Sequence, residues 1–328
     1  MLLSICIPTY NYEEYITDCL NSILNQDIET TKYEIVIGDS SSNNKTTEIV
    51  KKLKKKNKNI IYKKFQKKSG IDIDLEKTIE MCSGQYILFF SSDDFLKPNA
   101  LDTIFKNLSS KNTIYLFNRI ICDIMLKEKK RTNWLSKNIN NSVFYLKKNK
   151  SLLKFLDNST SIGAIFSYMS SIIVNRKIYL DTKIDPDFIG TNYLHVQKIL
   201  NILFKGDRSL KYLSSHLVYF RGENDSFKKN GYVNRILMDF TCYKLLHKKF
   251  FSKGEVSESF LKIMRNEHKF YYLIRVGEYF KNNTEWLNFK EYLKYYKYNL
   301  FQIYIIRLLG KSKLIINSLR KLKKLFEF

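Results

Sequence analysis

The segment QYILFFSSDDFLKPNAL, residues 85–101, decides how the first half of this chain is interpreted. Residues 86–90 are all apolar, which is typical of a strand buried on both faces of a sheet. The run leads directly into Ser91, Ser92, Asp93 and Asp94, and Pro98 follows at the place of a first helical residue. The segment therefore predicts a buried strand that delivers two adjacent carboxylates to its carboxyl end, followed by a helix.

The residues before this segment alternate between short apolar runs and helical patterns. The apolar runs predict strands at residues 2–7, 33–37, 59–64 and 86–90. Apolar residues at helical spacing predict helices at residues 15–24, 46–56, 75–82 and 98–108. Asn11 and Glu14 form a predicted capping box before the first helix. This alternation, with strands that are apolar throughout, predicts an α/β fold with a mostly parallel sheet and helices on both faces.

Polar residues follow three of the predicted strands at the point where each strand ends. They are Pro8, Thr9, Tyr10 and Asn11 after the first strand, Asp39 and Ser40 after the second, and Ser91, Ser92, Asp93 and Asp94 after the fourth. A surface turn alone also favours Ser and Asp. Three such sets are better explained by a ligand crevice, because parallel strands end at one edge of a sheet and ligands bind there.

The adjacent carboxylates favour a divalent cation at this edge. Mg²⁺ and Mn²⁺ prefer oxygen ligands, and Mg²⁺ is commonly held by one or two carboxylates together with substrate phosphates. The sequence contains neither of the two glycine-rich phosphate-binding patterns, G-x-x-x-x-G-K-[ST] and G-x-G-x-x-G. A bound metal would then carry much of the charge of a diphosphate leaving group.

Three stretches in this order and spacing resemble family 2 glycosyltransferases. They are SICIPTYNYEEYITDCLNSILNQ (residues 4–26), YEIVIGDSSS (33–42) and GQYILFFSSDDFLKPNAL (84–101). The resemblance is strong over residues 1–110 and weaker to about 225. Residues 69–94 look most similar to bacterial abequosyltransferase-type enzymes of O-antigen assembly. The resemblance implies a GT-A fold, which is Rossmann-like, over residues 1–230. The residue pattern after it predicts an α-helical C-terminal region at 231–328.

The family resemblance implies transfer of a sugar, with inversion, from a nucleoside-diphosphate donor such as a UDP-sugar to a hydroxyl of a glycan or lipid-linked glycan acceptor. It implies that Pro8, Thr9 and Tyr10 hold the nucleoside. It also implies that Asp39 accepts a hydrogen bond from the imide N–H of the base. The sequence departs from the family's D-x-D motif, which falls on Ser91, Ser92 and Asp93. Asp93 is then the main ligand of Mg²⁺ or Mn²⁺, with Asp94 sharing that role and Ser92 near the donor.

Two further acidic residues, Asp72 and Asp74, precede the fourth strand. The resemblance allows either of them to face the donor sugar or its ribose, and a structural role explains them equally well. Arg221 follows the predicted strand in HLVYFRGENDSF and is a candidate partner of the donor diphosphate, because a fixed cation stabilises developing negative charge. An ordinary surface charge is the alternative for Arg221.

The general base is the second departure from the family. Family members usually supply it from an acidic pair about ninety residues after the metal motif, following a glycine. Here the stretch DPDFIGTNYLHVQKIL has Thr191 and Asn192 after Gly190, and neither side chain is a base. Two replacements remain open: His195, one helical turn after Asn192, and Asp187, before the helix.

The last hundred residues predict several helices, which pack on the first domain or form an oligomer contact. Residues 315–326 carry an apolar stripe beside Arg320, Lys321, Lys323 and Lys324. A basic amphipathic helix suits peripheral association with the cytoplasmic face of the inner membrane. Packing of the stripe on the fold is the alternative.

Composition leaves two other classes of function open. The chain has 328 residues and a net charge of +24, which also suits nucleic-acid binding, but no nucleic-acid-binding motif is present and no nucleic-acid partner is expected. Ser91 and the Thr191–Asn192 pair are compatible with a non-catalytic scaffold for glycan assembly.

Five widely spaced cysteines indicate reduced thiols, and no apolar run is long enough for a membrane span, so the expected location is cytoplasmic.

Overall fold

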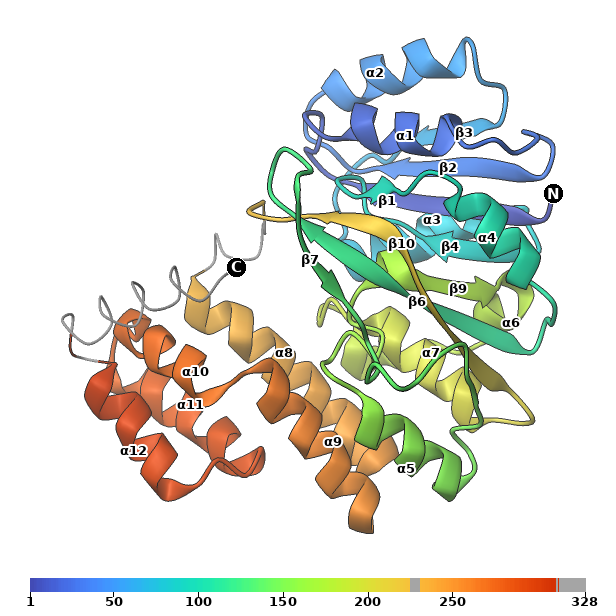
Figure 1. Ribbon diagram of the computed structural model, residues 1–328. Helices are drawn as coiled ribbons and strands as arrows, with labels where there is room; N and C mark the ends of the chain where they lie inside the picture. Colours follow the sequence, from blue (N-terminus) through green and yellow to red (C-terminus); the bar gives the residue numbers. More distant parts are fainter. Residues whose placement is uncertain (225–230, 311, 313–328) are drawn as a thin grey trace. The chain divides into compact units, whose positions relative to one another are not determined.

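The computed structural model describes residues 1–224, 231–310 and 312 (Figure 1). The chain divides into two compact units. The N-terminal unit comprises Met1–Ser159 and Gly163–Asn224, and the C-terminal unit comprises Thr160–Ile162 and Asp225–Phe328. All five cysteines are buried free thiols.

A single large sheet forms the centre of the N-terminal unit. Its strands in chain order are β1 (Leu3–Thr9), β2 (Tyr33–Asp39), β3 (Ile60–Lys64), β4 (Tyr86–Phe89), β5 (Phe95–Leu96), β6 (Thr113–Cys122), β7 (Glu128–Thr132), β8 (Val143–Phe144), β9 (Ile172–Asn175) and β10 (Ser209–Arg221). The spatial order is β3-β2-β1-β4-β9-β6-β10-β5, with β7 paired to β6 and β8 to β10. Strands β3, β2, β1 and β4 are parallel, and β9 is antiparallel to both of its neighbours. The predicted mostly parallel α/β sheet is confirmed.

The strand order reverses direction between β1 and β4, and this reversal positions the site. The chain moves outward from β1 to β2 and β3, then returns to place β4 on the other side of β1. Every residue of β1 and β2 is buried, which explains their mostly apolar sequences. The register sets Thr9 opposite Asp39 at the carboxyl ends of β1 and β2. The polar residues after β4 therefore emerge beside those after β1, at the usual location of a ligand crevice.

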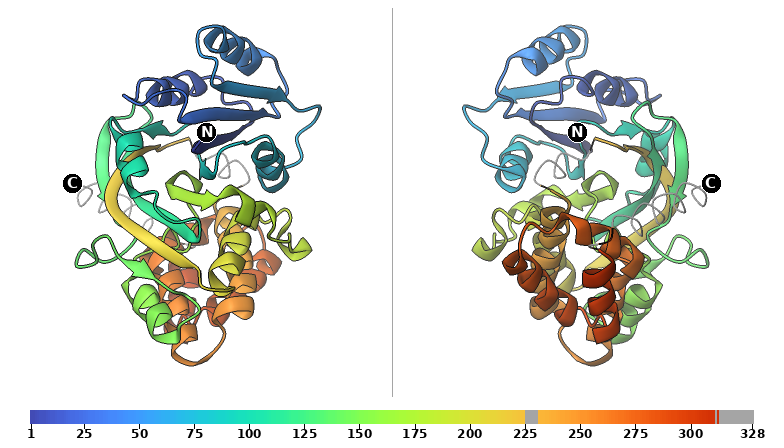
Figure 2. Two further views of the ribbon diagram at one scale, coloured as in Figure 1. Left: turned by 90° about the vertical axis from the view of Figure 1, so that its right-hand side faces the viewer. Right: turned by 90° about the vertical axis from the view of Figure 1, so that its left-hand side faces the viewer.

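Helices cover both faces of the sheet. In the N-terminal unit they are α1 (Ile16–Leu24), α2 (Lys45–Lys54), α3 (Ile71–Glu80), α4 (Ala100–Asn107), α5 (Asn149–Asn158), α6 (Arg176–Leu180) and α7 (Leu194–Phe204). Helices α1 and α2 lie on one side of β1–β3 and α3 lies on the other (Figure 2). Helix α1 turns Ile16, Cys19, Leu20 and Ile23 into the core, as its spacing predicts.

The predicted capping box before α1 is wrong. The helix begins at Ile16, and Asn11 lies well before it in the left-handed region, with φ 53°. The Asn11 side chain instead accepts a hydrogen bond from the Ser42 backbone N–H at 2.9 Å. Asn11 therefore joins the loops after β1 and β2, because a partner 31 residues away competes successfully with the local cap.

The C-terminal unit is helical, as predicted. Its helices are α8 (Tyr232–Leu246), α9 (Gly254–Glu267), α10 (Phe270–Val276), α11 (Asn283–Tyr295) and α12 (Leu300–Leu309). The buried ring of Phe240 on α8 packs against Phe289, Tyr292 and Tyr296 at centroid distances of 5.5, 6.0 and 4.8 Å. No described helix is both long and apolar enough to cross a membrane. The predicted amphipathic stripe at 315–326 lies outside the described residues.

Candidate active site

Asp39 ends β2 as a fully buried carboxylate with fixed partners. Its Oδ1 accepts the Ser41 backbone N–H at 2.7 Å. Its Oδ2 accepts the Tyr62 hydroxyl at 2.7 Å and the Lys64 ammonium at 3.4 Å. Burial, with a smaller contribution from this carboxylate, raises the pKa of Tyr62. Strand β3 therefore supplies two donors that orient the Asp39 carboxylate at the edge of the sheet.

The three residues predicted to contact a nucleoside lie beside Asp39. Pro8 pairs with Gly38 and Thr9 pairs with Asp39 in the β1–β2 ladder. Thr9 is 5% exposed, and its Oγ1 has no hydrogen-bond partner among the described residues. The Lys68 ammonium lies 3.8 Å from the centre of the Tyr10 ring. This edge thus offers a carboxylate acceptor, a hydroxyl and an aromatic ring next to a cation.

The two carboxylates after β4 have different surroundings. Asp93 Oδ1 accepts the Ser91 hydroxyl, and its Oδ2 accepts the Asn224 amide at 2.6 Å. Burial raises the pKa of Asp93, although these hydrogen bonds oppose the shift. Asp94 Oδ2 accepts the Tyr168 hydroxyl at 2.6 Å and the Ser170 hydroxyl at 2.5 Å. Burial and the charge of Asp93 raise the pKa of Asp94 to about 7.

The residues after β4 fit a metal that the substrate helps to bind. Among the described residues, no group of three or more His, Cys, Asp or Glu side chains forms a metal cage. Asp93 is 8% exposed and its two oxygens accept hydrogen bonds from Ser91 and Asn224, whereas the buried Asp94 Oδ1 has no hydrogen-bond partner in the described part of the chain. A Mg²⁺ or Mn²⁺ ion held by one carboxylate and substrate phosphates is compatible with this set. Ser92 is also buried beside the two carboxylates.

Arg221 lies at the site but is committed to protein acceptors. Its Nε donates to the Asp93 carbonyl at 3.1 Å, its Nη1 to the Ile124 carbonyl at 2.5 Å and its Nη2 to Asp18 Oδ2 at 2.8 Å. The side chain is 5% exposed. Arg221 therefore fixes the backbone of the carboxylate motif, and its geometry gives no separate support for the predicted contact with a diphosphate.

Asp72 and Asp74, near the start of α3, bind the protein itself. Asp74 Oδ2 accepts the Ser40 hydroxyl at 2.7 Å, so it ties α3 to the residue after Asp39. Asp72 accepts three backbone N–H groups, from Gly190 and Asn192 at 2.9 Å and from Leu194 at 3.1 Å. Both carboxylates are buried. Asp72 thus faces the turn before α7, and no sequence pattern links residues so far apart.

The two candidates for the general base differ in accessibility. The His195 side chain is 5% exposed, and its Nε2 lies 3.1 Å from the Phe166 carbonyl. Burial lowers the pKa of His195 to about 4, so the ring is neutral near pH 7. Asp187 is exposed on the short 3₁₀ helix Pro186–Phe188. The geometry gives no support to His195 as a base and leaves Asp187 open.

Several residues of the site carried no recognisable signal in the sequence. Tyr168, Ser170, Asn224 and Asp18 hold the carboxylate motif or Arg221. Arg119 lies within 5 Å of the centres of three aromatic rings, those of Trp134, Tyr168 and Phe220. The hydrogen bonds made by Tyr168, Ser170, Asn224 and Asp18 join segments more than 70 residues apart, so spacing along the chain does not reveal them.

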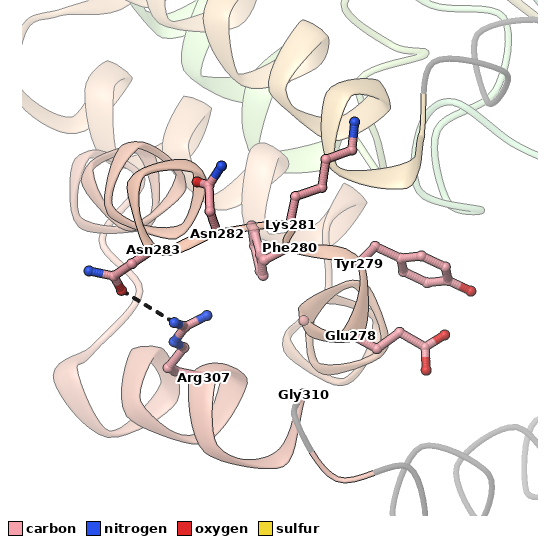
Figure 3. Close-up of a pocket in the computed structure, with 9 residues that line it drawn as sticks. Glu278, Tyr279, Phe280, Lys281, Asn282, Asn283, Arg307 and Gly310 are labelled. Atoms are coloured by element: carbon pink, nitrogen blue, oxygen red, sulfur yellow. Dashed lines mark hydrogen bonds between the residues drawn. The ribbon is translucent and has the colours of Figure 1, made fainter.

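A separate cavity of about 440 Å³ lies within the C-terminal unit (Figure 3). It is lined by Gly277, Glu278, Tyr279, Phe280, Lys281, Asn282, Asn283, Arg307 and Gly310. Arg307 Nη2 donates to Asn283 Oδ1 at 3.3 Å across it. None of the predicted site residues lines this cavity, so it does not take part in the candidate site.

Comparison with known proteins places these features in a family. The model of the Glycosyl transferase family 2 matches residues 4–178. The abequosyltransferase RfbV of Salmonella typhimurium is 31% identical over 98% of both chains. A crystal structure of S. aureus TarS 1–349 with UDP-GlcNAc matches with a TM-score of 0.64 and 16% identity, over 98% of this chain and 92% of that one. The mannosyltransferase PcManGT from Pyrobaculum calidifontis, with GDP-Man and Mn²⁺, matches with a TM-score of 0.54 and 13% identity, over 99% and 87%.

Proposed function

The chain belongs to glycosyl transferase family 2, an inverting family, and on that premise we propose that it transfers a sugar from a UDP-sugar to a hydroxyl of a glycan or lipid-linked glycan in bacterial surface polysaccharide synthesis. The observation that carries the proposal is the placement of Asp39 and Asp93. Asp39 ends β2 and Asp93 follows β4, on either side of β1, where the strand order reverses. This is the place where an open α/β sheet binds a nucleotide.

Asp39 and its neighbours would bind the nucleoside. A uracil ring has one imide N–H, and a carboxylate oxygen is a strong acceptor for it. Pro8, Thr9 and Tyr10 would line the other side of the base and ribose, with the unpaired Thr9 Oγ1 available as a polar contact. TarS, which shares the fold, binds UDP-GlcNAc, and this supports a UDP-sugar as donor.

Asp93 would bind a Mg²⁺ or Mn²⁺ ion together with the donor diphosphate. When bound, such an ion neutralises the negative charge that develops on the leaving diphosphate. Ser91 takes the place of the family's first aspartate and donates its hydroxyl to Asp93, so one carboxylate remains as the direct ligand. Asp94 would act mainly through Tyr168 and Ser170, and its unpaired Oδ1 faces no described donor. The Mn²⁺ in PcManGT supports this assignment.

Asp187 would act as the general base, in preference to His195. A base must reach the hydroxyl whose proton it takes. His195 is enclosed, and its Nε2 is bonded to the Phe166 carbonyl, whereas Asp187 is exposed just before the turn that leads into α7. The acceptor would be a glycan carried on a lipid, which brings the enzyme to the cytoplasmic face of the inner membrane as a peripheral protein.

A donor screen tests the proposed function. Purified protein with Mn²⁺ or Mg²⁺ is titrated with UDP-, dTDP-, GDP- and CDP-sugars, and slow donor hydrolysis is followed. We expect selective binding of a UDP-sugar. Replacing Asp93 with Asn should abolish the metal dependence of UDP-sugar binding. Replacing Asp187 with Asn should lower turnover by about 100-fold or more, with donor binding retained.

The control is Asp102→Asn on α4, because that exposed carboxylate bonds only to Lys106 in the described contacts. It should behave as the wild type does. Binding of a donor without turnover in any condition would favour the scaffold alternative. No binding of any nucleotide sugar would refute the proposal.

A further inference from the structure

We propose that Asp72 is a positioning residue for this reaction: its carboxylate fixes the turn Gly190–Leu194 and, through that turn, the segment that carries Asp187. The inference rests on the proposed function, and it replaces the expectation that Asp72 touches the donor. It concerns a residue of α3 that acts on a loop more than a hundred residues later.

The first argument is the set of contacts around the carboxylate. The backbone N–H groups of Gly190, Asn192 and Leu194, every second residue, converge on the two oxygens of Asp72 at 2.9, 2.9 and 3.1 Å. Asp72 is 4% exposed. Successive amides that point inward form a concave anion-binding backbone. Here a side chain of the protein occupies that concavity, so the turn takes its shape around Asp72.

The second argument is the backbone conformation of the turn. Gly190 has φ 83° and Asn192 has φ 68°, both in the left-handed region. Asn tolerates this conformation better than most residues, but it still requires support from its surroundings. The three hydrogen bonds to Asp72 supply that support. Without them, the turn is free to relax toward a more ordinary backbone.

The third argument is that the turn is continuous with the Asp187 segment. The Thr191 backbone N–H and hydroxyl both donate to the Phe188 carbonyl, at 3.2 and 2.7 Å. The Asp187 backbone N–H donates to Asp185 Oδ1 at 3.1 Å. A shift of the turn therefore moves the short 3₁₀ helix that carries Asp187.

The fourth argument is location. Helix α3 follows β3, so its first turn lies at the carboxyl edge of the parallel strands, where the donor site is proposed. Asp74, two residues after Asp72, bonds Ser40 beside Asp39. Glu76, one helical turn after Asp72, accepts a hydrogen bond from the Lys198 ammonium of α7 at 2.7 Å. Three acidic residues of α3 thus join the nucleoside edge, the turn and α7.

The test compares Asp72→Asn with a control that perturbs α3 without touching the turn. An asparagine keeps the size of the side chain but offers one acceptor oxygen, and its amide would face a backbone N–H. The control is Ile79→Val, a buried position on the same helix. For each protein we would measure donor affinity, donor-hydrolysis kcat and KM, and hydrogen exchange of the peptide that covers residues 189–195.

We expect Asp72→Asn to lower kcat by about 10- to 100-fold while donor affinity stays within about twofold of the wild type, because a misplaced reacting group affects turnover. Exchange at residues 190–194 should accelerate. In an Asp187→Asn background the same change should have little further effect on kcat, because the two residues act in series. Ile79→Val should leave kcat unchanged even if it lowers the melting temperature.

Three results would overturn the inference. The first is a kcat within twofold of the wild type, and the second is a raised donor KM with unchanged kcat, which would restore direct donor contact. The third is unchanged exchange at residues 190–194. If the wild type hydrolyses no donor at all, the proposed function fails instead, and exchange alone then decides whether Asp72 fixes the turn.

Discussion

At the scale of single residues, neighbours in the sequence serve different purposes. Asp93 and Asp94 are adjacent, but their oxygens meet different partners: Asn224 and Ser91 for the first, Tyr168 and Ser170 for the second. The two carboxylates are therefore held by different parts of the chain: Asp94 by the residues just before β9, and Asp93 by Ser91 and Asn224.

The burial of His195 predicts how the free energy of unfolding depends on pH. Its pKa is about 4 in the folded protein, against about 6.5 when unfolded. Because the folded pKa is lowered, the unfolded state binds the proton first as the pH falls. The stability contributed by the neutral ring is complete above about pH 6.5 and is lost between there and pH 4.

Urea denaturation of the wild type and His195→Gln checks this. Between about pH 7.5 and pH 5, the wild type should lose about 2 kcal/mol more than the variant, because glutamine can keep a donor toward the Phe166 carbonyl but does not titrate. The difference between the two proteins isolates His195 from the buried carboxylates Asp72, Asp93 and Asp94, whose raised pKa values act in the opposite direction. Equal pH dependence in both proteins would contradict a buried neutral His195.

The buried pair Glu76–Lys198 gives a second prediction. Lys198 is 2% exposed on α7, and its ammonium lies 2.7 Å from Glu76 and 4.0 Å from the centre of the Tyr179 ring. Lys198→Met leaves the Glu76 carboxylate with the Tyr179 hydroxyl as its hydrogen-bond donor among the described residues. We expect a loss of about 3–5 kcal/mol in the free energy of unfolding.

The double variant Glu76→Gln/Lys198→Met should recover most of that loss, because it removes both charges. Chemical denaturation of both variants beside the wild type checks the pair. If Lys198→Met is as stable as the wild type, the Lys198 ammonium is solvated and this contact does not hold α7.

Sequence patterns predicted some of these residues and not others. Asp39 and Asp93 follow apolar strands, and strand ends are visible in the sequence as apolar runs that stop at polar residues. Asp72 looked equally suited to a ligand, because nothing local distinguishes a carboxylate that faces a crevice from one that binds a turn 118 residues later. Arg221 was placed correctly at a strand end, but its three acceptors come from three separate segments.

At the scale of elements, the strands that were predicted best are those buried on both faces. Strands β1, β2 and β4 appear as apolar runs because both faces of the sheet are covered there, so side chains pointing to either face are buried. The hairpin from β6 to β7 was not predicted, because β7 is mostly exposed and reads Glu-Lys-Lys-Arg-Thr. Its pairing to β6 comes from backbone hydrogen bonds, which leave no hydrophobic pattern.

A close contact between two glycines predicts the response of the C-terminal unit to a small change. A Cβ at Gly277 would lie 2.7 Å from the Gly310 Cα and 2.8 Å from the Ile306 carbonyl oxygen, both backbone atoms. Gly277 follows α10 directly, so alanine would otherwise favour helix. Because backbone cannot rotate away, Gly277→Ala should destabilise the protein by about 1–3 kcal/mol.

Denaturation followed by the emission of Trp286, in a Trp134→Phe background, checks this contact. The sequence has only two tryptophans, and Trp286 lies in the C-terminal unit, so its emission reports that unit. Lys281→Ala, an exposed residue of the same cavity, is the control and should have little effect. Stabilisation by Gly277→Ala would show that α10 and α12 are not in such close contact.

At the scale of the whole molecule, charge and exposed apolar surface bear on where the enzyme works. The net charge is +24, and six of the basic residues that contribute to it follow α12 in the sequence: Lys311, Lys313, Arg320, Lys321, Lys323 and Lys324. On α12, Leu300, Phe301, Tyr304 and Leu308 are 77, 70, 62 and 50% exposed. Phe301, Tyr304 and Leu308 share one face of the helix. An exposed aromatic and aliphatic stripe on a strongly basic chain suits the surface of an anionic bilayer.

Vesicle sedimentation tests this association. The full-length protein should bind phosphatidylglycerol vesicles and not phosphatidylcholine vesicles, and binding should weaken as salt is raised. Phe301→Ser/Leu308→Ser should lower the partition coefficient by about 10-fold or more, because each side chain loses apolar burial worth about 1.5–3 kcal/mol when complete. Tyr271→Ser, at a residue of α10 that is 57% exposed, is the matched control and should bind as the wild type does.

Light scattering on the same proteins separates the membrane from a second copy of the chain. A wild type that is dimeric, with a monomeric double variant, would assign the α12 stripe to a subunit interface. A monomeric wild type that binds anionic vesicles equally well with and without Phe301 and Leu308 would leave the basic residues as the sole attachment. Loss of vesicle binding in a monomeric, folded double variant would place α12 against the lipid, and the enzyme's acceptor would then be delivered in the plane of the membrane.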